Sequence, residues 1–336
     1  MKFAKVYFFV LFFLLSAIFV HADDENSFYL KTENILVDQK GRHIKIDKPF
    51  KRIISLYGAH TENLFYLGLD QEIIGVTQPD KYPRRVLSKK VFSQSDDPEK
   101  YLVEKPDLIL IRPMLDRGYA KLFDRLEKNG IIVISLQPKN IEEMFRYWKI
   151  LGILTGREKE SSLMIEKFKQ SVDAYRLITD GLTDRPYVYF EAIHTKMKTF
   201  TKGAMADFVL TASGGINVAA DGSPSRGTNI AIYGKERILS KASQIDVFIS
   251  QRGAMNRINR EIIKKEPGFH IIKAVQNDRI FIVDETIVSR PTMRLLCGIS
   301  EIGTFLYPDL FKDKAEEILK ETFERNERGD ELKIDE

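Results

Sequence analysis

One long helical segment, residues 157–180, divides the chain into two halves. It reads REKESSLMIEKFKQSVDAYRLITD and contains no glycine or proline. Its apolar positions repeat with helical spacing. Such a helix spans about 30 Å, enough to connect two domains, although the periodicity alone does not distinguish it from an ordinary surface helix. The apolar positions are Leu163, Ile165, Phe168, Val172, Tyr175 and Ile178.

On both sides of this segment, short β-branched runs alternate with amphipathic helical stretches. This alternation is typical of βαβ units and predicts an α/β fold with mainly parallel sheets. A weak internal repeat indicates that the two halves are related units: EKYLVEKPDLILI at 99–111 and ERILSKASQIDVFI at 236–249 share the same layout. The expected strands are 52–56, 72–76, 107–111, 131–136, 187–192, 216–219, 245–250 and 279–283. The expected helices besides 157–180 are 60–69, 98–104, 117–129, 140–155 and 291–307.

The two ends of the chain differ from the middle. Lys2 and Lys5 precede an apolar run to Val20 and a small residue at Ala22, the pattern of a cleavable signal peptide over residues 1–22, with a single membrane anchor as the alternative. No cysteine stands directly after this run, at the processed end, so we expect a periplasmic protein without a lipid anchor. From residue 312 the chain is charged, and we expect a solvated helix and a disordered tail.

Candidate binding residues follow the predicted strands. In open parallel sheets ligands bind beyond the carboxyl ends of the strands, and arginine recurs there in this chain. Because its planar fork grips carboxylate or phosphate, this recurrence predicts a bulky anionic ligand, although any single arginine could instead pair with a neighbouring acid. The candidates are Tyr57, His60, Arg112, Glu191, His194, Arg226, Arg252, Arg290 and Arg294.

Motifs of common enzyme classes are absent from the sequence. It lacks the G-x-G-x-x-G, P-loop, G-x-S-x-G and H-E-x-x-H patterns, so we predict no catalytic residue and no cofactor. A metal site built from His60, His194 and Glu191, in a metal-dependent α/β enzyme, remains the alternative from a different class. The formal net charge of only +4 gives no reason to expect a nucleic-acid partner.

Four stretches together resemble a known family: RIISLYGAHTENLFYLGLDQEIIGVT, YLVEKPDLILIRP, LEKNGIIVISLQPKNIEEMFRYWKILGILTG and RIFIVDETIVSRPTMR. They look like the helix-linked periplasmic binding proteins of ABC importers, which take up ferric siderophores, haem and cobalamin. The resemblance covers residues 50–311 and implies two Rossmann-like lobes joined by one long helix. The implied parts are an N-terminal lobe (31–156), a linking helix (157–181), a C-terminal lobe (182–311) and a charged helix or tail (312–336).

The resemblance also implies partners and a ligand. A monomer would hold a metal chelate between its lobes and deliver it to an inner-membrane ABC permease with its ATPase. Glu99 and Glu236, one from each lobe, match positions that dock onto such a permease. We favour a ferric siderophore, then cobalamin. Haem would need Tyr57, His60 or His194 as an axial iron ligand.

Overall fold

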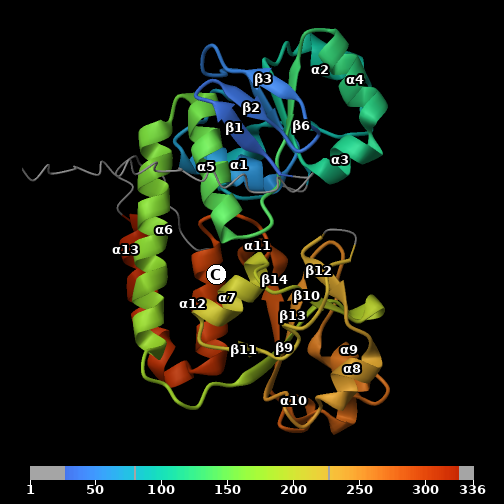
Figure 1. Cartoon of the computed structure of the whole chain (residues 1–336), viewed down its shortest axis with the longest axis vertical. Coiled ribbons are helices and arrows are strands. Elements are labelled where there is room, and N and C mark those ends of the chain that lie inside the picture. The colour runs from blue at the N-terminus through green and yellow to red at the C-terminus, as the bar shows by residue number, and fades with distance from the viewer. Residues whose placement is uncertain (1–26, 79–80, 226–227, 325–336) are drawn as a thin grey trace, which may run out of the picture.

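The computed structural model describes residues 27–78, 81–225 and 228–324, which form two α/β lobes joined by a single helix, α6 (Glu158–Thr179). Figure 1 shows the N-terminal lobe above the C-terminal lobe, with α6 along one side from one lobe to the other. This arrangement confirms the predicted fold class. The expected signal peptide, Arg226 and the end of the expected tail lie outside the described residues. Within those residues, no helix has the length and apolarity that a membrane crossing requires.

The N-terminal lobe is built on a five-stranded, wholly parallel sheet of order β6-β5-β4-β7-β8. Its central strands are β-branched and buried on both faces, as expected where helices cover a parallel sheet. The strands are β4 (Ile53–Ser55), β5 (Ile73–Thr77), β6 (Lys90–Phe92), β7 (Leu108–Ile111) and β8 (Ile132–Ser135). The helices are α1 (Gly58–Tyr66), α2 (Pro98–Val103), α3 (Pro113–Gly118), α4 (Ala120–Lys128) and α5 (Ile141–Thr155), with a 3-10 turn at Arg84–Ser88.

A small antiparallel sheet, which the sequence did not lead us to expect, precedes this lobe. Its strands are β1 (Tyr29–Thr32), β2 (Ile35–Val37) and β3 (His43–Lys45). Arg42 ties it to the lobe, because its guanidinium group bonds Asp38 at 3.0 Å and Asp116 of α3 at 2.6 Å. Asp38 also accepts a hydrogen bond from the backbone N–H of Ser135 in β8, at 2.9 Å.

Gly156 ends α5 and allows the chain to turn directly into α6. It has a φ of +67°, in the left-handed region that favours glycine. The Arg157 N–H bonds the carbonyl oxygen of Gly152 at 2.7 Å, which closes a Schellman-type helix end. A Cβ at position 156 would also lie 2.8 Å from Pro49.

The C-terminal lobe has a mixed sheet of order β12-β10-β9-β13-β14, with β11 paired to β9. Strands β9, β13 and β14 are parallel, whereas β10 and β12 run antiparallel to their neighbours. The strands are β9 (Tyr187–Ile193), β10 (Lys198–Phe200), β11 (Ile216–Asn217), β12 (Ile230–Ile232), β13 (Val247–Arg252) and β14 (Ile280–Asp284). The helices are α7 (Met205–Ala212), α8 (Lys235–Ser240), α9 (Arg260–Lys265), α10 (Lys273–Gln276), α11 (Glu285–Val288) and α12 (Leu295–Leu306), with 3-10 turns at His194–Lys196 and Phe269–Ile271.

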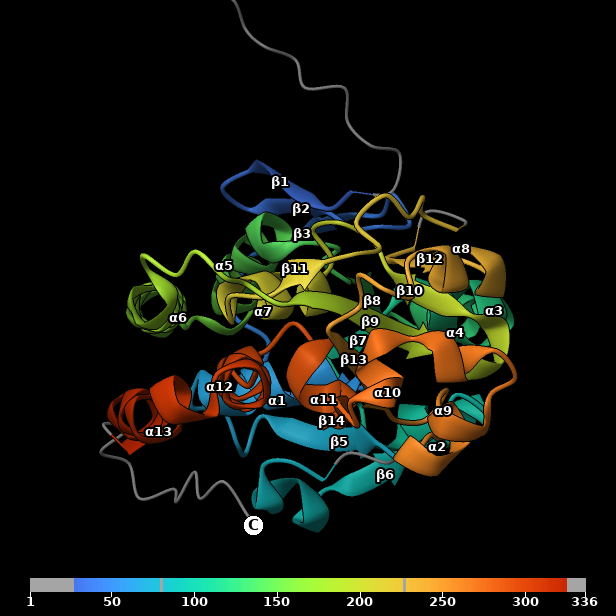
Figure 2. The ribbon, with the colours of Figure 1, turned by 90° about the horizontal axis from the view of Figure 1, so that it is seen from below.

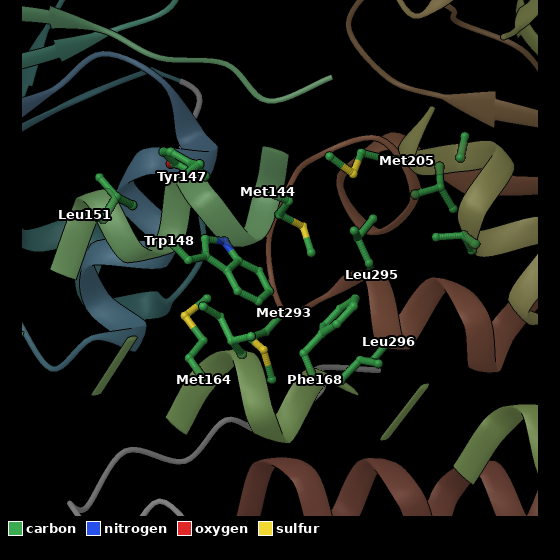
Figure 3. Close-up of a cluster of buried hydrophobic side chains, with 14 of the residues drawn as sticks. Met144, Tyr147, Trp148, Leu151, Met164, Phe168, Met205, Met293, Leu295 and Leu296 are labelled. Carbon is green, nitrogen blue, oxygen red and sulfur yellow. The ribbon is translucent and has the colours of Figure 1, made fainter. Parts of the chain in front are cut away.

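A single hydrophobic core continues from one lobe into the other. It contains Met144 and Trp148 of α5, Phe168 of α6, and Met293 and Leu296 from the start of the α12 region. Figure 3 shows the indole of Trp148 with Met164 and Met293 next to it. Because closely packed interiors resist deformation, this shared core limits how far the lobes move against each other.

The charged C-terminal segment packs more closely than expected. It forms α13 (Pro308–Glu324), whose Phe311 is fully buried and stacks on Tyr175 of the linking helix, with ring centroids 6.1 Å apart. Thr322 shares a 2.7 Å hydrogen bond with Ser171. Figure 2 shows α6, α12 and α13 gathered on one side of the molecule. The expectation of a solvated helix is therefore wrong for the face that contacts α6.

Candidate ligand-binding site

Tyr57 and Arg112 form the N-terminal side of the candidate site. Tyr57 follows β4 and precedes α1, while Arg112 follows β7 and precedes α3, so parallel neighbouring strands deliver both to one sheet edge. The guanidinium carbon of Arg112 lies 4.9 Å from the centre of the Tyr57 ring, a cation–π contact. Burial raises the pKa of the Tyr57 hydroxyl, and the positive charges of Arg112 and of Arg290 from the other lobe oppose part of that shift.

His60, expected at the ligand, is a buried structural residue instead. Its side chain has no solvent exposure. Nε2 donates to the carbonyl oxygen of Ile111 at 3.0 Å, so Nδ1 accepts from the Tyr147 hydroxyl at 2.6 Å. Burial lowers the pKa of His60 to about 4, which keeps the ring neutral. Because both ring nitrogens are occupied, we remove His60 from the candidate ligand contacts; its role is to hold the backbone just before Arg112.

Arg290 and Arg294, from the segment between α11 and α12, reach across the lobe boundary to one acid of α1. Nη1 of Arg290 lies 3.0 Å from Oε1 of Glu62, and Nε of Arg294 lies 3.0 Å from Oε2. The Glu62 side chain is only 3% exposed. The guanidinium group of Arg294 also lies over the ring of Tyr82, 4.3 Å from its centre. Both arginines therefore lie between the lobes, where they bind a carboxylate of the protein itself.

Glu191 and His194 form a buried network inside the C-terminal lobe rather than a ligand-facing pair. Glu191 is fully buried and accepts from the Ser250 hydroxyl at 2.7 Å and from Nδ1 of His194 at 2.8 Å. Burial by itself would lower the pKa of His194, but the carboxylates of Glu191 and Glu266 outweigh it and raise the pKa. The side-chain oxygen of Asn256 accepts from the backbone N–H of His194 at 3.0 Å. We therefore assign this network to holding the loop after β13.

Of the two remaining predicted arginines, Arg252 and Arg226, the structure describes only Arg252. Arg252 ends β13 and is exposed, at the same sheet edge as Ser289, whose hydroxyl bonds the side chain of Gln251 at 2.7 Å. Burial and the charge of Asp284 raise the pKa of Glu301 to about 6, with Arg252 opposing the shift. Arg226 lies outside the described residues.

The two predicted docking acids occupy matching places in the two lobes. Glu99 is the second residue of α2, which leads into β7, and Glu236 is the second residue of α8, which leads into β13. Figure 1 shows these helices at opposite ends of the molecule. Both side chains are exposed, and Glu99 pairs with Arg125 of α4. The weak internal repeat of the sequence thus corresponds to two equivalent positions in the fold.

The interlobe contacts include residues that the sequence did not bring to attention. Asn63 donates from Nδ2 to the carbonyl oxygen of Pro291 at 3.0 Å, and Trp148 donates from Nε1 to the same oxygen at 3.2 Å. Glu62 and Asn63 are adjacent polar residues in a helix that is buried from Gly58 to Phe65. Polar residues in so buried a helix need hydrogen-bond partners. The adjacent polar pair Glu62 and Asn63 was therefore the sequence feature that could have indicated these interlobe contacts.

The arrangement does not fit the metal site that was the alternative to a binding protein. His60 belongs to the N-terminal lobe and bonds Tyr147, whereas His194 and Glu191 bond each other in the C-terminal lobe. Across residues 27–78, 81–225 and 228–324, no three side chains of His, Cys, Asp or Glu are grouped to hold a metal ion. The alternative of a metal site built from His60, His194 and Glu191 is therefore wrong.

Comparison with known proteins gives this geometry a context. Residues 53–286 match the family described as periplasmic binding protein. The chain belongs to this family. Its single linking helix places it in the helix-linked class, which confirms the resemblance read from the sequence. Family membership identifies a binding protein rather than an enzyme, and it places the protein outside the cytoplasm.

Individual relatives cover most of the chain. An uncharacterized ABC transporter substrate-binding lipoprotein of Bacillus subtilis is 26% identical over 82% of this chain and 86% of its own length. A vitamin B12-binding protein of Vibrio cholerae is 27% identical over 77% and 91%. A possible iron-binding periplasmic solute-binding protein of Staphylococcus epidermidis has a solved structure with a TM-score of 0.67 and 30% identity, covering 77% of this chain and all of its own.

Proposed function

We propose that the protein captures a metal chelate between its two lobes and delivers it to the permease and ATPase of an ABC importer in the inner membrane. The observation that carries the proposal is that side chains of both lobes converge at one sheet edge. Arg112 lies over the ring of Tyr57, and Arg290 from the opposite lobe bonds Glu62 of α1, the helix that Tyr57 directly precedes. The relatives named for vitamin B12 and iron support a chelate as the cargo.

The proposed ligand contacts are Tyr57, Arg112 and Arg252, with the exposed parts of Arg290 and Arg294. A ferric siderophore remains the first candidate, and a corrinoid is the second because of the vitamin B12-binding relatives. Haem receives less support, since both ring nitrogens of His60 are in internal hydrogen bonds, and His194 is buried beside Glu191 and Glu266. Tyr57 is the axial ligand we favour among the three candidates.

A ligand screen tests the proposal. The purified protein is mixed with a ferric trihydroxamate, a ferric tris-catecholate, cyanocobalamin or haemin, and Trp148 emission and melting temperature are followed. A ligand present at 100 times its dissociation constant should stabilise the fold by about 2.7 kcal/mol. Arg112→Gln should weaken binding, whereas Arg257→Gln, an exposed change further along the chain, should not. If no chelate changes either signal, the proposed cargo is wrong.

Docking is tested separately from binding. We propose that Glu99 and Glu236 orient the protein on two permease subunits as a monomer with one contact per lobe. Exposed ion pairs contribute only about 0–1 kcal/mol each, so their effect is on encounter and orientation. Glu99→Arg with Glu236→Arg should abolish chelate uptake by the native host while ligand affinity is retained. The matched control is Glu142→Arg with Glu261→Arg; uptake that survives the first pair refutes the docking assignment.

A further inference from the structure

The acid between the lobes, Glu62, faces two guanidinium groups and is almost completely removed from water. Oε1 accepts from Arg290 at 3.0 Å and from Nη2 of Arg294 at 3.2 Å, while Oε2 accepts from Nε of Arg294 at 3.0 Å. Charge-assisted bonds to a buried carboxylate are strong and directional. Each arginine side chain is still 19% exposed, so this group borders the space between the lobes rather than lying deep inside either one.

Neighbouring contacts fix the group in place. Asn63, next to Glu62 on α1, bonds the carbonyl oxygen of Pro291, which directly follows Arg290. Trp148 donates to the same oxygen from α5. Tyr82 covers the face of Arg294. The two guanidinium groups are therefore held where they are, and Glu62 is their shared counter-ion.

This geometry changes the charge available to a ligand. Without Glu62, Arg290 and Arg294 would present two positive charges at the edge where Tyr57 and Arg112 lie. The carboxylate of Glu62 offsets one of these two charges. Glu62 and Glu285 also act on the Tyr57 hydroxyl, in opposition to Arg112 and Arg290. The ligand-facing edge is consequently much less positive than its number of arginines indicates.

We propose that Glu62 is a specificity-determining residue, which partly neutralises Arg290 and Arg294 and so favours chelates that carry little negative charge over multiply anionic ones. The inference rests on the proposed function and narrows its ligand class. A neutral ferric trihydroxamate and cyanocobalamin fit such a site, whereas a triply anionic ferric tris-catecholate does not.

The test measures the ratio of two dissociation constants, that of the ferric tris-catecholate divided by that of the ferric trihydroxamate, by quenching of Trp148. In the unchanged protein the ratio should be at least about 10. Glu62→Gln removes the negative charge and should lower the ratio about tenfold or more, because an added positive charge attracts a triply charged ligand at this range. Glu72→Gln, which removes an acid at the far end of β5, should leave the ratio unchanged.

A second substitution separates charge from structure. Glu62→Gln with Arg294→Gln restores the original net charge while the interlobe bonds stay broken, so the ratio should return to the starting value. Arg290→Gln leaves Glu62 bonded to Arg294 and lowers the positive charge, so the ratio should rise about tenfold. This variant also provides the test if Glu62→Gln does not fold.

Each outcome is decisive. A folded Glu62→Gln or Arg290→Gln protein with an unchanged ratio overturns the inference but leaves the proposed function standing. A double variant that keeps the shifted ratio assigns the effect to the broken contact and also overturns it, as does an unchanged protein that prefers the tris-catecholate. Failure of the unchanged protein to bind any of the four chelates of the ligand screen refutes the proposed function, and the inference fails with it.

Discussion

Nε1 of Trp148, in the N-terminal lobe, donates a hydrogen bond to the carbonyl oxygen of Pro291 in the C-terminal lobe at 3.2 Å. Trp148 is the only tryptophan of the chain and lies in the core that the lobes share (Figure 3). Its fluorescence therefore reports directly on the contact between the lobes. The shared core and this bond hold the two lobes against each other.

Trp148→Phe should lower the free energy of unfolding by about 1–3 kcal/mol. The variant loses the hydrogen bond to Pro291 and leaves a space beside Phe168, whose ring centre is 5.4 Å away. Urea unfolding followed by circular dichroism measures the loss. Tyr189→Phe is the control, because its buried hydroxyl has no hydrogen-bond partner among the described residues, and its removal should be neutral or stabilising. Equal losses in both variants would contradict the importance of the interlobe bond.

His60 should make the fold less stable in acid. Its pKa is about 4 in the folded protein and about 6.5 in the unfolded chain. Between these values the unfolded chain binds a proton that the folded protein excludes, so stability falls as the pH drops from about 7 to 4, by about 3 kcal/mol. Urea midpoints across this range measure the slope. His60→Gln should be less stable at pH 7 but should lose this slope; an unchanged slope would show that another group causes it.

His194 should act with the opposite sign. Its folded pKa is raised by Glu191 and Glu266, so its contribution is fully present below the unfolded pKa of about 6.5 and is lost as the pH rises through the folded value. His194→Gln should therefore flatten the stability curve on the alkaline side, whereas His60→Gln flattens it on the acid side. Proton NMR of the imidazole Cε1–H checks the assignment directly: a His194 pKa below the ordinary histidine value of about 6.5 would contradict it.

The fold could be predicted from the sequence because the spacing of apolar residues distinguishes strands from helices. The strand at 107–111 and the helix at 157–180 are long or strongly patterned, and both occur close to their predicted positions, as β7 and α6. Short strands such as β10 and β12 carry too few residues for a clear pattern. Leu163 was placed on the apolar face of the linking helix but is 64% exposed, and Met164 is buried instead, since one step along a helix turns the side chain by about 100°.

The candidate site could be predicted only in part, because a sequence does not show which side chains will contact each other. The rule for strand ends selected Tyr57 and Arg112, which do contact each other. It could not reveal that Glu62 would reach Arg290 and Arg294, more than 220 positions later. It also could not separate a ligand-facing histidine from one satisfied inside, as His60 is.

Gly303, in α12, should not tolerate a side chain. A Cβ at this position would lie 2.1 Å from the ring of Phe311, a fully buried residue of α13. Gly303→Ala should therefore push α13 away from α12 and cost about 1–3 kcal/mol, even though alanine favours a helix. Gly118→Ala is the matched control, since a Cβ there meets nothing within 4 Å, and it should be neutral or slightly stabilising. Thermal unfolding of both variants measures the difference. If Gly303→Ala is as stable as Gly118→Ala, α13 is not packed against the rest of the fold, and the close contact of the charged C-terminal helix with α12 and the linking helix is refuted.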